Sequence, residues 1–217
     1  MISSGIKDTL ASSASICTVL QFLAGVLVCR KIIKNGSTGN NSALAFVTCY
    51  TSCVLWMRYG MLIEDRFVLL VNIFGSVLQA SYVWVFILYS TKRYKTVRQM
   101  IGATCFLGAV YFYSIYEPDK ALAAKYVGFF SCSVTVLFFA SPLMLLTHVV
   151  KVKSTESLPF PIIVSSLIVS CQWFAYGCLI DDRFIQIPNF LGCVLSAFQL
   201  CFFLIYRNEQ ASEARLI

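Results

Sequence analysis

The sequence predicts an all-α membrane protein with seven transmembrane helices, arranged as two parallel three-helix repeats joined by a linker helix. The first observation is composition. Of the 217 residues, 59% are hydrophobic and only 12% are charged, which is more apolar surface than a soluble domain of this size can bury. The second is a set of seven long apolar stretches, and the third is an internal repeat that relates the first three stretches to the last three.

Each apolar stretch is about long enough to cross the hydrocarbon core, which takes about 20 mostly apolar residues. The expected spans are residues 10–29, 43–63, 67–89, 100–116, 126–147, 160–180 and 184–206. The expected organisation follows from them: a first repeat at 10–90, a linker helix with its loops at 91–123, a second repeat at 124–207 and a short cytosolic tail at 208–217.

The charged residues indicate how the chain is oriented. Lys and Arg concentrate in the loops after the first, third and fifth stretches and after the seventh, whereas the other loops are acidic or balanced. Cytoplasmic loops carry an excess of Lys and Arg, so the N-terminus is expected outside and the C-terminus in the cytosol. Because the net charge of +7 lies in short loops rather than on one helix face, we expect a lipid bilayer and no nucleic acid as partner.

The internal repeat has a constant offset of 117 residues, the separation of Trp56 and Trp173. At this offset Trp56-x-x-Tyr59-Gly60 matches Trp173-x-x-Tyr176-Gly177, and Asn72 matches Asn189. Three helices are an odd number, so two copies face the same way only if an unpaired fourth span lies between them. Transporters built from parallel repeats hold their substrate at the repeat interface.

Four of the repeated residues are candidate substrate contacts: Trp56, Asn72, Trp173 and Asn189. An asparagine amide offers donors and an acceptor suited to hydroxyl groups, and an indole offers a flat apolar face with one N–H donor. The alternative is structural, with asparagines in interhelical hydrogen bonds and tryptophans in helix packing. The recurrence of both residue types in both repeats favours substrate binding.

Prolines predict flexible points in the second repeat. Pro142 lies within the fifth stretch and Pro159 opens the sixth, and their counterparts in the first repeat are Gly25 and Ser42. A proline inside a helix removes a backbone hydrogen bond and kinks the helix. Glycine also permits bending, so we expect a hinge or gate in both repeats, with different mechanics in the first.

One cation lies inside an apolar stretch. Arg58 is within the second stretch, and its counterpart is Ala175. Intramembrane charges are functional by default, yet Arg58 is close to the outer end of its stretch. We therefore expect its side chain to extend to the membrane edge or to pair with Glu64 or Asp65.

This set of motifs resembles the SWEET family of sugar transporters, and the chain looks closest to its animal, insect-type branch. The resemblance implies uniport of mono- or disaccharides by alternating access, with the paired asparagines and tryptophans around the sugar. It also implies specificity positions that face the cavity, and these map to Thr18, Gln21, Thr135 and Phe138. Gly25 and Ser42 depart from the four prolines of the family pattern, which affects the first-repeat gate more than the sugar site.

Other classes of protein fit the sequence less well. An exporter of amino acids or other small solutes, of the PQ-loop type, shares the architecture and is the main alternative, but the chain has no Pro-Gln pair. No catalytic group, cofactor or metal site is expected, because nothing pairs a nucleophile with a base or assembles metal ligands. The plasma membrane is the expected location, with the Golgi or another internal membrane as the alternative, and the identity of the sugar and the formation of a homo-oligomer stay open.

Overall fold

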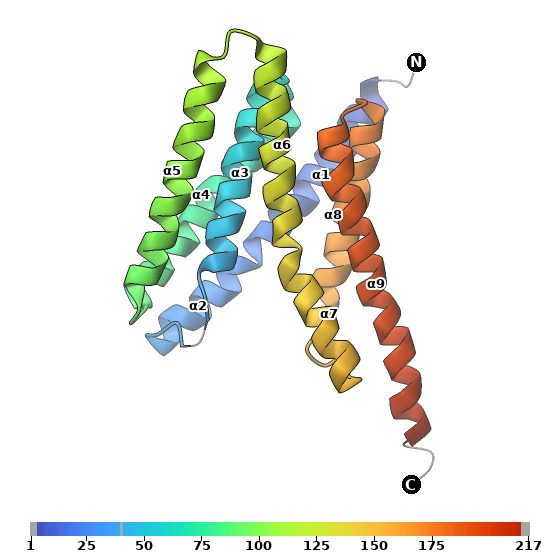
Figure 1. The fold of residues 1–217 in the computed structure, drawn as a ribbon. Helices are drawn as coiled ribbons and strands as arrows, with labels where there is room; N and C mark the ends of the chain where they lie inside the picture. Colours follow the sequence, from blue (N-terminus) through green and yellow to red (C-terminus); the bar gives the residue numbers. More distant parts are fainter. Residues whose placement is uncertain (1–3, 40, 214–217) are drawn as a thin grey trace. The chain divides into compact units, whose positions relative to one another are not determined.

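The computed structural model describes residues 4–39 and 41–213, so the last four residues of the expected tail lie outside the described residues. Within the described part, every regular element is a helix (Figure 1). The helices are α1 (Ser4–Leu23), α2 (Gly25–Asn35), α3 (Leu44–Leu62), α4 (Arg66–Tyr89), α5 (Arg93–Tyr116), α6 (Lys120–Phe138), α7 (Ala140–Val152), α8 (Phe160–Leu179) and α9 (Arg183–Glu213).

These helices form seven continuous segments, as predicted. A single residue separates α1 from α2, and another separates α6 from α7. By length and composition, five segments among the described residues can cross a membrane: Gly5–Asn35, Arg66–Tyr89, Lys120–Val152, Phe160–Leu179 and Arg183–Tyr206. Polar groups lower the mean hydropathy of the other two, since α3 carries Arg58 and α5 begins in a run of cations.

Four of the seven segments, α1–α2, α5, α6–α7 and α9, extend five or more residues further than the hydropathy pattern indicates. Helix α5 begins at Arg93, seven residues before the expected span, and α9 continues to Glu213, through the first part of the expected tail. Hydropathy marks where a helix meets lipid, whereas Lys, Arg and Glu are good helix formers and let the backbone continue into water. The apolar stretches therefore located the spans but not the helix ends.

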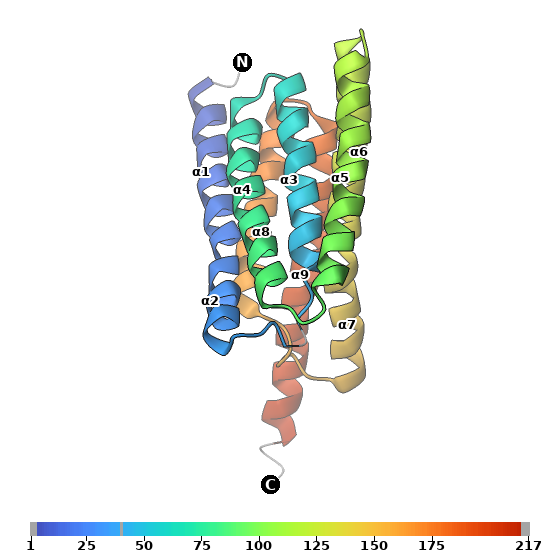
Figure 2. The same cartoon turned by 90° about the vertical axis from the view of Figure 1, so that its left-hand side faces the viewer.

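The helices pack into two units, which are described separately: residues 18–138, and the described residues before Thr18 and after Phe138. In the first unit α3 is central and packs against α4, α5 and α6, and α2 packs against α4 (Figure 2). In the second unit α8 packs along α9, which also contacts α7. The units are defined by contacts between helices, whereas the repeats are defined by matching sequence. The units therefore do not test the expected domain boundaries, which stay predictions.

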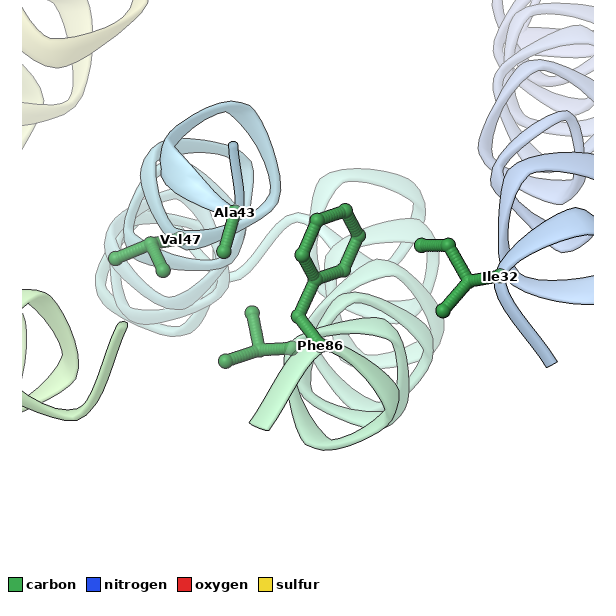
Figure 3. Close-up of a cluster of buried hydrophobic side chains, with 5 residues drawn as sticks. Ile32, Ala43, Val47 and Phe86 are labelled. Carbon is green, nitrogen blue, oxygen red and sulfur yellow. The ribbon is translucent and has the colours of Figure 1, made fainter. Parts of the chain in front are cut away.

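Each unit has an apolar cluster near the end of its helices. In the first unit the cluster consists of Ile32, Ala43, Val47, Val83 and Phe86. Figure 3 shows the Phe86 ring between Ile32 on one side and Ala43 on the other. The second unit has a cluster of Val149, Leu158, Ile163 and Tyr206, in which Val149 is the repeat counterpart of Ile32. Each cluster packs the helix that follows the break against the beginning of the next helix and against the third helix of the repeat.

Candidate functional site

A helical hairpin positions the candidate residues of the first repeat. The turn between α3 and α4 closes with a hydrogen bond of 2.9 Å from the Asp65 N–H to the Gly60 carbonyl. The Asp65 carboxylate then accepts from the N–H groups of Phe67 (2.9 Å) and Val68 (3.0 Å), which caps α4. An aspartate at this position accepts hydrogen bonds from N–H groups that have no partner within the helix, and its negative charge interacts favourably with the positive end of the helix dipole. Trp56 on α3 and Asn72 on α4 are thereby held on adjoining helices.

The second repeat builds the same turn between α8 and α9. The Asp182 N–H donates to the Gly177 carbonyl at 2.9 Å, and its carboxylate accepts from Phe184 (2.9 Å) and Ile185 (3.2 Å). The matched residues Glu64 and Asp181 both adopt left-handed backbone, with φ of 56° and 55°. The repeat seen in the sequence is thus also a repeat of turn geometry.

Matched glycines let the two helices of each hairpin approach closely. A Cβ on Gly60 would lie 2.8 Å from the backbone nitrogen of Leu69, and a Cβ on Gly177 would lie 3.0 Å from that of Gln186. Leu69 and Gln186 are themselves repeat counterparts. Because backbone atoms cannot turn aside, both positions require a residue without a side chain. This explains the glycine of the Tyr-Gly pair in each repeat.

Both candidate asparagines are anchored in the same way. The Asn72 side-chain amide donates to the Val68 carbonyl at 2.8 Å, and the Asn189 amide donates to the Ile185 carbonyl at 2.8 Å. Each side chain is half-buried. An amide that uses one N–H in this way keeps a second N–H and a carbonyl oxygen with which to bind a ligand hydroxyl. The bond to its own helix fixes the direction in which these groups point.

The candidate tryptophans also have equivalent settings. Trp56 packs edge-to-face against Tyr59, with ring centroids 5.5 Å apart and planes at 84°, and Trp173 packs against Tyr176 at 5.7 Å and 82°. Such pairs fix the orientation of the indole at a modest gain in stability. In both repeats the ring that could face a ligand is therefore held by the tyrosine one turn further along the helix.

The structure brings two of the predicted site residues into contact. The Trp56 indole N–H donates to the Thr135 hydroxyl at 2.9 Å, and that hydroxyl donates to the Ser131 carbonyl at 2.9 Å. Ser52 lies 3.2 Å from the same threonine hydroxyl. Sequence reasoning missed Ser52, although its position one turn before Trp56 on the same helix face was a usable signal.

The other three expected specificity residues lie on α1 and at the end of α6. Phe138 is the last residue of α6 and is 39% exposed, while Thr18 and Gln21 lie half-buried on α1. Thr18 and Gln21 are one turn apart, so they share a helix face. Their assignment to specificity stays a prediction.

The four expected hinge residues lie at helix boundaries. Gly25 opens α2, and Pro142 lies in the first turn of α7, where the missing N–H of proline costs no intrahelical bond. Pro159 precedes α8. Ser42 precedes α3, and its hydroxyl accepts from the Leu44 N–H at 3.2 Å. Each member of a matched pair thus lies at the same kind of boundary.

Arg58 does not behave as expected. Its Nε donates to the Ser114 hydroxyl at 2.8 Å and its Nη2 to the Ser114 carbonyl at 2.9 Å, while the guanidinium lies 5.5 Å from the centroid of the Tyr111 ring. These partners are on α5, not at the Glu64–Asp65 turn. A charged side chain within a membrane span is stabilised by hydrogen bonds to nearby carbonyl and hydroxyl groups. Here Ser114 of the linker helix α5 supplies both groups. Arg58 therefore ties the linker helix to the first repeat.

Comparisons with known proteins fit this geometry. The family described as "Sugar efflux transporter for intercellular exchange" (MtN3_slv) matches the chain twice, at residues 8–94 and 125–211. Over 201 residues, which are 92% of this chain and 89% of the relative, the chain is 43% identical to sugar transporter SWEET1 of Drosophila pseudoobscura pseudoobscura. It is 31% identical to mouse sugar transporter SWEET1 over 100% of this chain and 99% of that protein.

The fold is similar to that of a solved protein. A structure described as that of a eukaryotic SWEET transporter, at 3.7 Å resolution, superimposes with a TM-score of 0.85 at 28% identity. The match covers 94% of this chain and 99% of the solved one. The likeness therefore extends over the whole sequence of helices.

Proposed function

The chain belongs to the SWEET family of sugar transporters, and we propose that it works as a bidirectional uniporter that carries a mono- or disaccharide by alternating access. Family membership makes it a multi-pass membrane transporter and not an enzyme. The curated relatives are named for sugar transport. The finer points, which are the mechanism, the lack of ion coupling and the residues that bind the sugar, are our proposals.

The main support for the proposed binding site is the duplicated helical hairpin. In each repeat an aspartate-capped turn, a close glycine, an edge-to-face Trp–Tyr pair and an asparagine bonded to its own helix recur with nearly the same geometry. A sugar presents hydroxyl groups at its rim and apolar C–H groups on its ring faces. Trp56, Asn72, Trp173 and Asn189 match these two kinds of surface. We propose that they bind the sugar.

The distribution of acids supports uniport without proton or sodium coupling. Glu64, Asp65, Asp181 and Asp182 lie at turns between helices, and the acids within helices, Asp8 in α1 and Glu209 and Glu213 in α9, lie toward the ends of those helices. Proton-coupled transporters rely on ionisable groups within the spans. We further propose a plasma-membrane location with the N-terminus outside, on the basis of the basic loops.

The test is a flux measurement in cells that lack hexose transport. Labelled glucose, fructose, sucrose and alanine are offered separately, with and without an ionophore that dissipates the proton gradient. We expect saturable sugar flux in both directions, unchanged by the ionophore. Sugar flux that collapses with the ionophore would refute uniport, and flux of alanine without sugar would favour the PQ-loop-type exporter.

A further inference from the structure

The break between α1 and α2 occurs without a proline. Helix α1 ends at Leu23 and α2 begins at Gly25. On either side of Ala24 the backbone uses tighter bonds, from the Ala24 N–H to the Gln21 carbonyl and from the Leu27 N–H to the Ala24 carbonyl, both 3.2 Å. Glycine permits such a departure from the helix but does not force it. Something else must hold the break.

A tyrosine from α4 occupies the break. The Tyr82 hydroxyl donates to the Phe22 carbonyl at 3.1 Å. In an unbroken α-helix the Val26 N–H would donate to the Phe22 carbonyl directly. The hydroxyl therefore interrupts the helical ladder, which is one of the recognised causes of a kink.

The Tyr82 ring also explains the glycine. A Cβ on Gly25 would lie 2.8 Å from Cδ2 of the Tyr82 ring and 3.0 Å from its Cζ, so the ring fills the volume that a side chain at position 25 would need. Tyr82 is only 4% exposed and packs edge-to-face against Phe46, with ring centroids 5.4 Å apart. Gly25 and Tyr82 are therefore sterically complementary.

The second repeat reaches a similar break by another route. At the offset of 117 residues, Pro142 corresponds to Gly25, Gln199 to Tyr82 and Phe139 to Phe22. Phe139 is the residue between α6 and α7. Pro142 lacks an N–H, so the carbonyl of Phe138, four residues before it, has no helical donor, whereas the Phe139 carbonyl still accepts from Leu143 at 3.1 Å. A proline frees a carbonyl permanently, whereas a tyrosine hydroxyl can release it.

The surroundings of the two breaks are otherwise matched. A Cβ on Gly75 of α4 would lie 2.5 Å from the Phe22 ring, and a Cβ on Gly192 of α9 would lie 3.5 Å from the Phe139 ring. In each repeat the phenylalanine at the break therefore rests on the same glycine of the third helix. The breaks differ in the group that interrupts the helical ladder and in the carbonyl that loses its helical donor, which is Phe22 in the first repeat and Phe138 in the second.

We propose that Tyr82 is the positioning residue of a first-repeat hinge, replacing the proline by a reversible hydrogen bond from its hydroxyl to the Phe22 carbonyl. With this bond made, the α1–α2 break is held. With it released, Val26 can make the helical bond to Phe22 that its counterpart Leu143 makes to Phe139 at 3.1 Å, and the segment straightens. The proposal rests on the transport function proposed above, because hinge bending matters only in a protein that changes conformation.

The first test removes the hydroxyl alone. Tyr82→Phe keeps the ring that packs on Gly25, and Tyr126→Phe, at an exposed tyrosine of α6, is the matched control. Hydrogen exchange at the Val26 amide should slow in Tyr82→Phe, and sugar flux should fall about fivefold, the effect of one hydrogen bond of about 1 kcal/mol. Equilibrium sugar binding should change less than flux. Exchange and flux equal to the control would overturn the proposal.

The second test exchanges the pair. Gly25→Pro alone places a ring where Tyr82 lies and should strongly reduce flux, and Tyr82→Gln alone should reduce it as well. The double variant Gly25→Pro/Tyr82→Gln reproduces the Pro142–Gln199 pair of the second repeat and should recover at least about half of wild-type flux, because the glutamine relieves the clash with the proline ring and the proline replaces the tyrosine in breaking the helix. A double variant no better than Gly25→Pro would overturn the proposal.

Hydrogen exchange separates the hinge from the transport function. It needs no sugar, so slower exchange at Val26 in Tyr82→Phe supports the hinge even if the wild-type protein carries none of the sugars offered. In that case the proposed function fails and the hinge stands. If the wild-type protein carries sugar but exchange at Val26 is unaltered in Tyr82→Phe, the proposed function stands and the hinge proposal fails.

Discussion

The two repeats are nearly identical at their hairpins and different at their first helices. The α3–α4 and α8–α9 hairpins share the capped turn, the close glycine and the anchored asparagine, with matched bonds that differ by only 0.2 Å or less. The α1–α2 break instead uses a glycine and a tyrosine, where α6–α7 uses a proline. The residues proposed to bind the sugar are thus alike in the two repeats, whereas the residues proposed to control bending differ.

The largest effect is expected where the repeats are most alike. Asn189→Ala should lower sugar flux about tenfold or more, because a bound sugar hydroxyl left without its hydrogen-bond partner costs about 1–3 kcal/mol. Asn72→Ala should behave in the same way. The measurement is uptake of labelled sugar normalised to protein in the membrane. Asn35→Ala, at the end of α2, is the control, and near-normal flux in Asn189→Ala would remove the asparagines from the proposed site.

The hairpin glycines should reveal how closely the repeats match. Gly60→Ala forces a Cβ against backbone atoms of Val68 and Leu69, whereas two of the three nearest atoms at Gly177 belong to side chains that can shift. Both substitutions should lower the free energy of unfolding, by about 1–3 kcal/mol, and Gly60→Ala should cost more. Thermal unfolding of the purified protein in detergent measures this. Gly108→Ala, where a Cβ would meet no atom within 4 Å, should leave the free energy of unfolding unchanged or raise it slightly, because alanine favours a helix more than glycine does. Equal behaviour of all three variants would contradict the packing argument.

Arg58 tests a feature that only the first repeat has. Arg58→Met keeps much of the side-chain volume but loses both hydrogen bonds to Ser114, and charge-assisted bonds of this kind are worth about 1.5–3 kcal/mol. We expect a lower unfolding temperature, with part of that loss shared by Ser114→Ala in a double-mutant cycle. If the two losses simply add, Arg58 and Ser114 are not coupled and the linker helix is held by other contacts.

The smallest effect is expected at the specificity positions. Phe138→Ala and Gln21→Ala should each change the ratio of disaccharide to monosaccharide flux, by about 2- to 5-fold, because a side chain at the edge of a cavity discriminates weakly by size. Competition between labelled glucose and labelled sucrose measures the ratio. An unchanged ratio in both variants would indicate that these side chains do not line the cavity.

Much of the candidate site followed from the sequence because the repeat is internal. The offset of 117 residues paired Trp56 with Trp173 and Asn72 with Asn189 without any related sequence, and the family assignment was confirmed by the comparisons. The partners of Arg58 were predicted wrongly, since the nearest acids in the chain are not its nearest acceptors in space. Ser52 and Tyr82 were missed because a hydroxyl is common in a span and its partner lies on another helix.

The sequence alone determined the all-α membrane class, the seven segments, the repeat and the family, because these depend on hydropathy, charge and periodic matches along the chain. Only the tertiary structure decided why Gly25 can stand where its counterpart is Pro142. That answer depends on Tyr82, which is 57 residues away along the chain yet has its hydroxyl 3.1 Å from the Phe22 carbonyl. A contact between helices leaves no local pattern, since each residue of the pair is ordinary by itself.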